Sequence, residues 1–195
     1  IYTAGCNFRC PYCHNYDIAR GKTEEIPIEK VKTFLEERKQ FLDAVTITGG
    51  EPTIHGELPD FCRMIKKLGY LVKLDTNGSN PKMIKKLLEN QLVDYIAMDI
   101  KAPWEKYQKI VGNNVNVDAI RESYRIIRSS FLPHEFRTTV HSRLLKLSDI
   151  ETIIEEVKEE VHFVQIARKT PQYPHLNAYT ARLLKNLLNG KVFIR

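Results

Sequence analysis

Three of the four cysteines lie within eight residues, and their spacing is that of a metal centre. Cys6, Cys10 and Cys13 are separated by three and then two residues in the stretch CNFRCPYC. Thiolates at this spacing in one loop can converge on one metal centre, and iron–sulfur clusters are usually held by thiolates. A structural zinc site normally closes with four ligands. Three ligands on a 4Fe–4S cluster would instead leave one iron open for substrate. The fourth cysteine, Cys62, lies on an apolar helical stripe and is expected in the core.

Two other metal-binding interpretations use the same residues. His14 or Cys62 could complete a zinc site, and residues 10–14 also read C-x-x-C-H, the attachment pattern of c-type haem. The haem interpretation leaves Cys6 unexplained. A zinc-stabilised module that binds nucleic acid stays open as an alternative. The chain lacks, however, the clustered basic residues with interleaved aromatics that such binding requires.

The composition is that of a globular protein. The chain has 195 residues, 43% hydrophobic and 28% charged, which predicts a single domain over residues 1–195. No apolar run approaches the roughly 18 to 20 residues that span a bilayer, and no leader is recognisable. Clustered thiols without a leader indicate a reducing compartment, so we expect a cytoplasmic protein. The first residue is Ile1 rather than Met, and we expect a further segment before it. The net charge of +6 is interpreted as a solvated surface, with contact to an acidic partner as the alternative.

Short apolar runs alternate with helical patterns along the whole chain. Strands are expected over residues 1–4, 44–48, 70–75, 95–100, 136–141 and 163–167. Helical apolar spacing lies between and after them, over residues 28–35, 58–65, 84–88, 120–127, 150–157 and 183–188. This alternation indicates a parallel sheet covered by helices. The first and fourth connections are long, so additional loops are expected there.

The strand residues favour a partial barrel over a doubly wound sheet, which the order of elements also allows. A strand that helices bury on both sides should be apolar on both faces, but one face of several strands here is polar. Asp99 shares a face with Lys101, and Arg137 shares one with Thr139 and His141. Charged side chains on one face of central strands imply a polar interior that holds a ligand. We therefore predict a partial α/β barrel.

Short motifs at the expected strand ends resemble those of one enzyme superfamily. CNFRCPYC is similar to the CxxxCxΦC signature of the radical S-adenosylmethionine (SAM) superfamily, with Tyr12 as the aromatic residue. Residues 48–52 read TGGEP, residues 75–78 read DTNG, and residues 99–101 read DIK. Together with residues 13–15 (CHN), this set resembles the activases of glycyl-radical enzymes. Within them it is most similar to the activating proteins of anaerobic ribonucleoside-triphosphate reductase, over residues 1 to about 168.

The resemblance implies a partial (β/α)6 barrel of the TIM type and an oxidoreductase that binds a 4Fe–4S cluster and SAM. Cys6, Cys10 and Cys13 are the implied cluster ligands, and the amino and carboxylate groups of SAM would chelate the open iron. The reduced cluster would cleave SAM to methionine and a 5′-deoxyadenosyl radical, which would take hydrogen from a glycine Cα in a partner enzyme. The residues expected to bind the cofactor are Tyr12, Gly49, Gly50, Glu51, Asp75, Thr76, Asn77, Asp99, Lys101, Arg137, His141 and Gln165.

Particular ends of SAM suit particular residues. Glu51 and the backbone of the two neighbouring glycines can accept hydrogen bonds from the ammonium, and Lys101 can meet the carboxylate as a point charge. By resemblance, Asp75, Thr76 and Asp99 hold a monovalent cation against that carboxylate, with an internal ion pair as the alternative. The family often carries Val-Pro-Gly after the fifth strand. Here residues 140–143 read VHSR, a departure on the strand of the implied ribose or sulfonium contacts.

The implied partner is a glycyl-radical enzyme, most simply an anaerobic ribonucleotide reductase. An enzyme of the pyruvate formate-lyase type and a non-glycyl substrate are the alternatives. No cysteine lies between Cys13 and Cys62, so no cluster-bearing insert follows the cysteine loop. A flavodoxin- or ferredoxin-like electron donor is expected, and contact with membrane or nucleic acid is not. Trp104 and Tyr107 are candidates for contact with the partner, with packing beneath a loop as the alternative.

Overall fold

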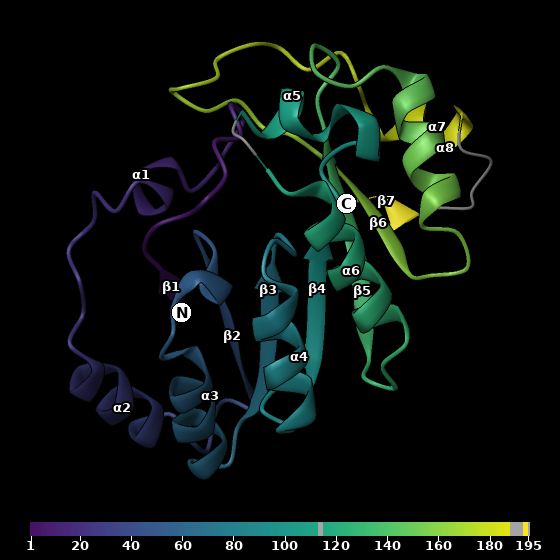
Figure 1. The fold of residues 1–195 in the computed structure, drawn as a ribbon. Helices are drawn as coiled ribbons and strands as arrows, with labels where there is room; N and C mark the ends of the chain where they lie inside the picture. The colour runs from purple at the N-terminus through teal and green to yellow at the C-terminus, as the bar shows by residue number, and fades with distance from the viewer. Residues whose placement is uncertain (113–114, 188–192, 195) are drawn as a thin grey trace.

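The fold is an open parallel sheet with helices packed against one face (Figure 1). A computed structural model describes residues 1–112, 115–187 and 193–194. The strands in these ranges are β1 Tyr2–Thr3, β2 Ala44–Gly49, β3 Leu71–Thr76, β4 Tyr95–Asp99, β5 His134–Val140, β6 His162–Ile166 and β7 Phe193–Ile194. The first six match the expected strands to within two residues, and β7 is an additional strand at one edge.

The strands follow one another across the sheet in the order of the sequence. Every neighbouring pair is parallel. In a doubly wound sheet the strand order reverses at a switch point, so that the helices of the two halves cover opposite faces of the sheet. Sequential order instead sends every crossover to the same side, which is the arrangement of a barrel wall. The expected partial barrel is therefore confirmed, with β1 and β7 at its two open edges.

Six longer helices correspond to the six expected helices. They are α2 Ile28–Glu37, α3 Leu58–Lys67, α4 Pro81–Glu89, α6 Val117–Arg128, α7 Leu147–Glu156 and α8 Ala181–Leu187. Residue 188, the expected end of the last helix, lies outside the described residues. The two long connections contain short elements that the sequence pattern does not reveal: α1 Tyr16–Ala19, and the 3₁₀ turn η2 Trp104–Lys106 followed by α5 Tyr107–Val111. A further 3₁₀ turn, η1 Pro52–Ile54, follows β2.

Across the ranges that the structure covers, no helix combines the length and the apolar character needed to cross a bilayer.

Side chains of the central strands alternate between a helix-covered core and a polar interior. One residue on each of five strands is fully buried in the core: Ile47, Leu74, Met98, Phe136 and Val164. The next residue along each strand lines a cavity instead: Thr48, Asp75, Asp99, Arg137 and Gln165. Since successive side chains of a strand point to opposite faces, one side of the sheet packs and the other binds. Cys62 lies in the core, with no exposed surface.

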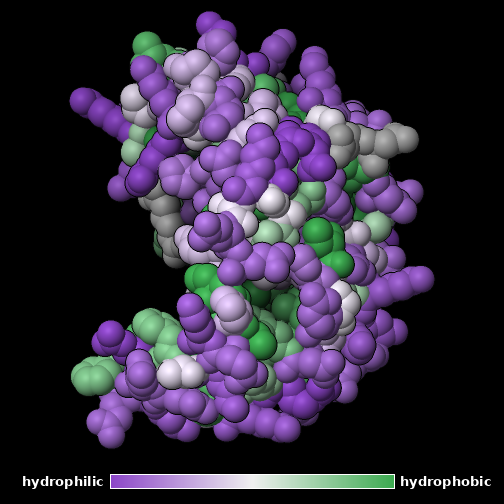
Figure 2. Space-filling model, turned by 90° about the vertical axis from the view of Figure 1, so that its left-hand side faces the viewer, coloured by the Kyte–Doolittle hydropathy of each residue, from purple (hydrophilic) through white to green (hydrophobic). Residues whose placement is uncertain are grey.

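Apolar side chains are exposed on β1 and on and around α2. Leu35 is the one buried residue of α2. Exposed apolar side chains gather in this region: Tyr2, Ile26, Ile28, Phe34, Phe41 and Leu42. Figure 2 shows the corresponding face, which is largely hydrophilic but contains a hollow with apolar side chains inside it.

His162 makes the stability of the fold depend on pH. Its Nε2 lies 2.9 Å from the hydroxyl of Thr138, which itself donates to the carbonyl of Ile100 at 2.8 Å. The imidazole Nε2–H is therefore the donor to Thr138, and Nδ1 has no hydrogen-bond partner among the described residues. Protonation would place a buried charge at Nδ1, and burial lowers the pKa of His162 to about 4.

We expect wild-type stability to fall as the pH drops from about 6.5 to about 4, because the unfolded chain binds a proton there and the folded chain does not. Between pH 7.5 and pH 5 the loss from this residue should be about 2 kcal/mol. Urea unfolding of the wild type and of His162→Gln at both pH values measures it. The variant should lack this part of the pH dependence. An equal stability difference between the two proteins at both pH values would contradict the assignment.

Candidate functional site

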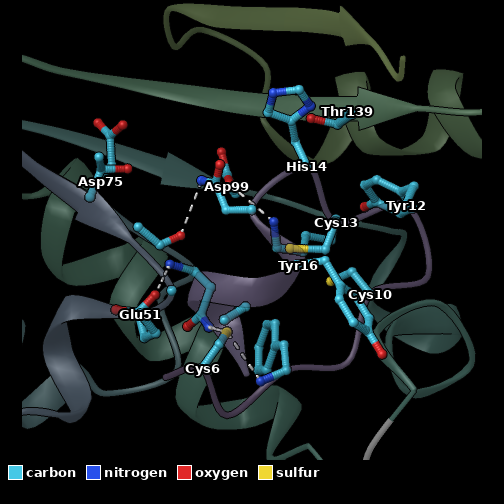
Figure 3. A pocket seen from close by; sticks show the side chains of 18 of the residues that line it. Cys6, Cys10, Tyr12, Cys13, His14, Tyr16, Glu51, Asp75, Asp99 and Thr139 are labelled. Atoms are coloured by element: carbon cyan, nitrogen blue, oxygen red, sulfur yellow. Dashed lines mark hydrogen bonds and ion pairs between the residues drawn. The ribbon is translucent and has the colours of Figure 1, made fainter. Parts of the chain in front are cut away.

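A cavity opens at the carboxyl ends of the strands, beside the loop that carries the cysteines (Figure 3). Its volume is about 280 Å³. Parallel strands bring their carboxyl ends to one edge of a sheet, so motifs far apart in the sequence meet there. Fourteen of the fifteen expected site residues line the cavity: Cys6, Cys10, Tyr12, Cys13, Gly49, Gly50, Glu51, Asp75, Thr76, Asn77, Asp99, Lys101, Arg137 and Gln165.

His141 is the expected site residue that the structure does not bring to the cavity. Its buried ring packs edge-on against Tyr173, with ring centroids 4.9 Å apart. Its Nε2 lies 3.3 Å from the carbonyl oxygen of His175, and its Nδ1 accepts the backbone N–H of Arg143 at 3.2 Å. The strand β5 ends at Val140, so the alternation that would turn the next side chain inward no longer applies.

The three clustered cysteines are free thiols that line one side of the cavity. Burial raises the pKa of Cys10 to about 11. Burial also raises the pKa of Cys6, although the backbone N–H of Phe8 donates to its Sγ at 3.4 Å. Thiolates at these positions therefore need nearby positive charge, which a metal centre supplies.

The donor set suits a cluster better than a single ion. Among the described side chains, no three His, Cys, Asp or Glu residues are grouped closely enough to hold one metal ion. Cys6, Cys10 and Cys13 instead face a common cavity from one loop, as Figure 3 shows. Three soft thiolate donors in this arrangement fit the three protein ligands of an iron–sulfur cluster.

Two polar atoms that line the cavity lack a hydrogen bond, which fits a polar ligand. Within the described ranges, the Tyr12 hydroxyl and Asp75 Oδ1 are buried and have no hydrogen-bond partner, although the ammonium of Lys73 lies 3.7 Å from Asp75 Oδ1. Burial raises the pKa of Tyr12 above its ordinary value, so its hydroxyl stays protonated and can donate. Buried polar groups in folded proteins are almost always bonded. A ligand that carries both an acceptor and a cationic donor, as SAM does, would satisfy both atoms.

Arg9 supports the cysteine loop, a role that nothing in the sequence pattern indicated. Its guanidinium folds back on the loop and donates to the carbonyl of Phe8 at 2.8 Å and to that of Cys6. Its backbone N–H donates to the carbonyl of Val111 at 2.7 Å. Other lining residues that sequence reasoning did not assign are Tyr16, Arg20, Thr48 and Thr139. Of these, Thr139 carried a usable signal, because it shares the inward face of β5 with Arg137.

Two asparagines connect the cysteine loop to the strand ends. Asn15 Nδ2 donates to the carbonyl of Gly49 at 3.3 Å. Asn77 Nδ2 donates to Asn7 Oδ1 at 3.0 Å and lies 3.9 Å from the Sγ of Cys6. Hydrogen bonds to ligating sulfurs are one way in which proteins tune a cluster. His14, beside Asn15, also lines the cavity.

Glu51 is a buried carboxylate that joins the ends of β2 and β3. Its Oε1 accepts from the backbone and hydroxyl of Thr53, at 3.1 and 2.6 Å, and from the hydroxyl of Thr76 at 2.7 Å. Its Oε2 accepts the backbone N–H of Asn77 at 2.6 Å. Burial raises the pKa of Glu51, and these hydrogen bonds to the charged form act against that rise. Oε2 retains the capacity to accept from a ligand ammonium.

Paired charges lie at the inward ends of β3, β4 and β5. We call them the charged row, which consists of Asp75, Asp99, Lys101 and Arg137. The ammonium of Lys101 lies 3.0 Å from Asp99 Oδ2. Arg137 donates from Nε to Asp99 Oδ1 at 2.9 Å and from Nη1 to Asp75 Oδ2 at 3.1 Å. Burial alone would raise the pKa of Asp99, but Lys101 and Arg137 outweigh it and hold that pKa below its ordinary value. Burial works against a charged Lys101 as well, and Asp99 nevertheless raises its pKa. The two inward aspartates are therefore compensated by cations of the protein itself.

Gly50 allows the end of β2 to lie directly against the cysteine loop. A Cβ at this position would sit 1.8 Å from the carbonyl oxygen of Gly5, which is backbone and cannot rotate away. Glu51 N–H donates to that same oxygen at 2.9 Å. The close approach thus fixes the position of Gly5, the residue before Cys6.

Gly50→Ala should displace this contact, lower the stability by more than about 2 kcal/mol, and reduce iron incorporation. Gly56→Ala is the matched control, because no atom lies within 4 Å of its Cβ position. Urea unfolding and iron content after anaerobic reconstitution measure both effects. Equal values for the two variants would show that the approach at Gly50 is not needed.

The chain is similar to known proteins over most of its length. The sequence profile of the Radical SAM superfamily matches residues 1–142. Two proteins of Methanocaldococcus jannaschii, both named "Putative glycyl-radical enzyme activating enzyme", are 34% identical over 82% of this chain and 30% identical over 78% of it. The chain spans 68% and 60% of their lengths. The crystal structure of Streptococcus suis SuiB bound to S-adenosylmethionine shares the fold with a TM-score of 0.75 at 15% identity, covering 96% of this chain and 45% of that one.

Proposed function

Because the chain belongs to the Radical SAM superfamily, we propose that it is an activating enzyme that generates a glycyl radical on a partner enzyme, namely an anaerobic ribonucleoside-triphosphate reductase. The observation that carries the enzymatic part is the cavity that joins three free thiols to a row of paired charges. The names of the two relatives from Methanocaldococcus jannaschii support the glycyl-radical target. The choice of the reductase rests on the motifs of the sequence.

When bound, a 4Fe–4S cluster and SAM would supply an electron-driven cleavage to methionine and a 5′-deoxyadenosyl radical, which takes a hydrogen atom from a glycine Cα. Cys6, Cys10 and Cys13 would hold the cluster as thiolates. Lys101 would offer its ammonium to the carboxylate of SAM, and Glu51 would accept from the amino group.

The monovalent cation that the resemblance implies would bind beside the charged row. We propose a monovalent cation near Asp75 and Asp99 when SAM is bound, and Asp75 Oδ1 is the atom that supports it, since it has no hydrogen bond among the described residues and its ion-pair partner Lys73 lies 3.7 Å away. The guanidinium of Arg137 already compensates both carboxylates, so the cation would add to this pairing. Replacing K⁺ by choline at constant ionic strength should therefore weaken SAM binding without unfolding the protein.

The charge distribution favours an acidic protein partner. Residues 161–195 contain six Lys and Arg residues and no Asp or Glu, so the whole net charge of +6 arises there. Arg168 and Lys169, which follow β6 after one buried residue, are exposed. We propose a cytoplasmic protein that receives electrons from an acidic flavodoxin- or ferredoxin-like donor, with no role for membrane or nucleic acid. Raising the salt concentration should then slow SAM cleavage driven by a protein donor much more than cleavage driven by dithionite.

The test of the proposed function is a partner panel under anaerobic conditions. The reconstituted protein, dithionite and SAM are incubated with an anaerobic ribonucleotide reductase, with a pyruvate formate-lyase-type enzyme, or with neither. Electron paramagnetic resonance should detect a glycyl radical with the reductase alone. A radical on the formate-lyase-type enzyme would reassign the partner. Rapid SAM cleavage with no radical on either protein would point to a non-glycyl substrate.

A further inference from the structure

The connection after β4, residues 101–112, lies between the charged row and the cysteine loop. It contains η2 and α5 and ends at Gly112. Its central residue, Tyr107, has no exposed surface, so it is not available for contact with a partner protein. The ring of Trp104 stacks on it at a centroid distance of 5.8 Å and an angle of 11°. Tyr107 is therefore a packing residue, whereas Trp104, which packs on it, is partly exposed.

The hydroxyl of Tyr107 binds the backbone of the charged row. It accepts the N–H of Lys101 at 3.0 Å and lies 3.3 Å from the carbonyl oxygen of Asp99, to which it donates. These two residues flank the point where β4 ends, and their side chains carry the ion pair that faces the cavity. A phenylalanine at this position would leave the partly buried N–H of Lys101 without this acceptor.

The other side of the same connection contacts the cysteine loop. The ring of Tyr107 packs edge-on against that of Phe8, with ring centroids 6.4 Å apart. Phe8 lies between Cys6 and Cys10 in the sequence. Val111 accepts the backbone N–H of Arg9 at 2.7 Å. Gly112 ends α5 with a φ of 71°, and a Cβ there would lie 2.9 Å from the carbonyl oxygen of Arg9.

We propose that Tyr107 is a positioning residue that holds Lys101 in register with the cysteine loop. The cofactor implied by the family would be held at both places at once, at a cluster on the three cysteines and at the ammonium of Lys101. Misplacement of such paired groups by a fraction of an ångström weakens binding strongly. Tyr107 touches both parts, the strand end through its hydroxyl and the loop through its ring. The proposal rests on the cofactors of the family and is independent of the identity of the partner enzyme.

Tyr107→Phe tests the hydroxyl alone, and Tyr124→Phe is its matched control. The hydroxyl of Tyr124 also donates to a backbone carbonyl, that of Glu156 at 3.2 Å, and its ring also packs against Trp104. Tyr124 does not line the cavity. Both substitutions thus remove a tyrosine hydroxyl from a similar position, but only one of them affects the charged row.

The readouts are urea unfolding, iron and sulfide content, and the KM and kcat for SAM cleavage with dithionite as the electron donor. The change that SAM causes in the electron paramagnetic resonance spectrum of the reduced protein is a further readout. We expect Tyr107→Phe to keep its iron and its kcat within about twofold and to raise the KM for SAM about tenfold, the loss of about 1.4 kcal/mol of binding. The SAM-induced spectral change should need correspondingly more SAM. Tyr124→Phe should keep the wild-type KM.

An unchanged KM in Tyr107→Phe, or an equal rise in both variants, would overturn the proposal and leave Tyr107 a core residue.

If Tyr107→Phe does not fold, Gly112→Ala tests the same connection from the loop side. It should raise the KM for SAM with the wild-type charged row in place, and a wild-type KM would again overturn the proposal. None of these assays contains a partner enzyme. A failure of the glycyl-radical assignment therefore leaves their outcome intact.

Discussion

The protein with Cys10 replaced by alanine should assemble no intact 4Fe–4S cluster and should cleave SAM no faster than the background. Cys10 is the middle one of the three thiols, and burial raises its pKa to about 11. Two remaining thiolates cannot supply three protein ligands to a cluster. The cavity offers no replacement, because its lining includes no fourth cysteine among the described residues.

The measurement combines iron and sulfide content, visible absorbance and the formation of 5′-deoxyadenosine after anaerobic reconstitution. Cys62→Ala is the control, because Cys62 is equally a cysteine but is buried in the core on α3. It should lose about 1 kcal/mol of stability through the small cavity created and should keep its cluster and activity. Wild-type iron content and SAM cleavage in Cys10→Ala would contradict the ligand assignment. Loss of the cluster in Cys62→Ala alone would exchange the roles of the two residues.

The barrel could be predicted because its strands carry two separate signals. Each central strand places an apolar residue, such as Met98, next to a polar one, such as Asp99, and period-two alternation assigns them to opposite faces. Polar residues on the inner faces of several strands then require a ligand-binding interior. The residues Asp75, Asp99, Lys101 and Arg137 meet in the structure for this reason, although they come from three strands.

The parts that could not be predicted are those fixed by tertiary contact. The short helices α1 and α5 have too few residues to show a helical period, so their sequences read as loops. Arg9 wraps back on its own loop through backbone carbonyls, and a single arginine in a loop carries no sign of such a contact. His141 follows the alternation of β5 but lies one residue beyond its end. The bridging of two aspartates by Arg137 depends on strand register, which the sequence does not encode locally.

Arg137→Leu is the second substitution that should have a large effect, and its effect should fall first on stability. Arg137 is the cation that contacts both inward aspartates, and all three side chains are largely buried. Removing one partner of a buried ion pair leaves uncompensated charge, which typically costs about 3–5 kcal/mol. Lys101 still pairs with Asp99, and Lys73 lies 3.7 Å from Asp75 Oδ1, so we expect the lower end of that range.

Urea unfolding at neutral pH measures the loss, and Arg128→Leu is the control. Arg128 also bridges two carboxylates, those of Glu159 and Glu160, but its own side chain is exposed and the more buried Glu160 also pairs with His134. Solvent-exposed ion pairs contribute little, so this variant should remain close to the wild type. Equal losses in the two variants would show that the position of Arg137 in the barrel does not matter.

A second substitution separates the loss of pairing from the loss of packing. If uncompensated charge is the cause, Arg137→Leu combined with Asp75→Asn should be more stable than Arg137→Leu alone, because the neutral amide no longer needs a cation.

The pH dependence of the stability provides an independent check. In the wild type the lowered pKa of Asp99 stabilises the fold at pH values above the ordinary aspartate pKa, and this contribution is lost as the pH falls through the lowered value. Arg137→Leu should therefore lose part of its disadvantage in acid, where Asp99 becomes protonated. A disadvantage that stays constant from neutral to acidic pH would mean that leucine merely packs poorly at this position.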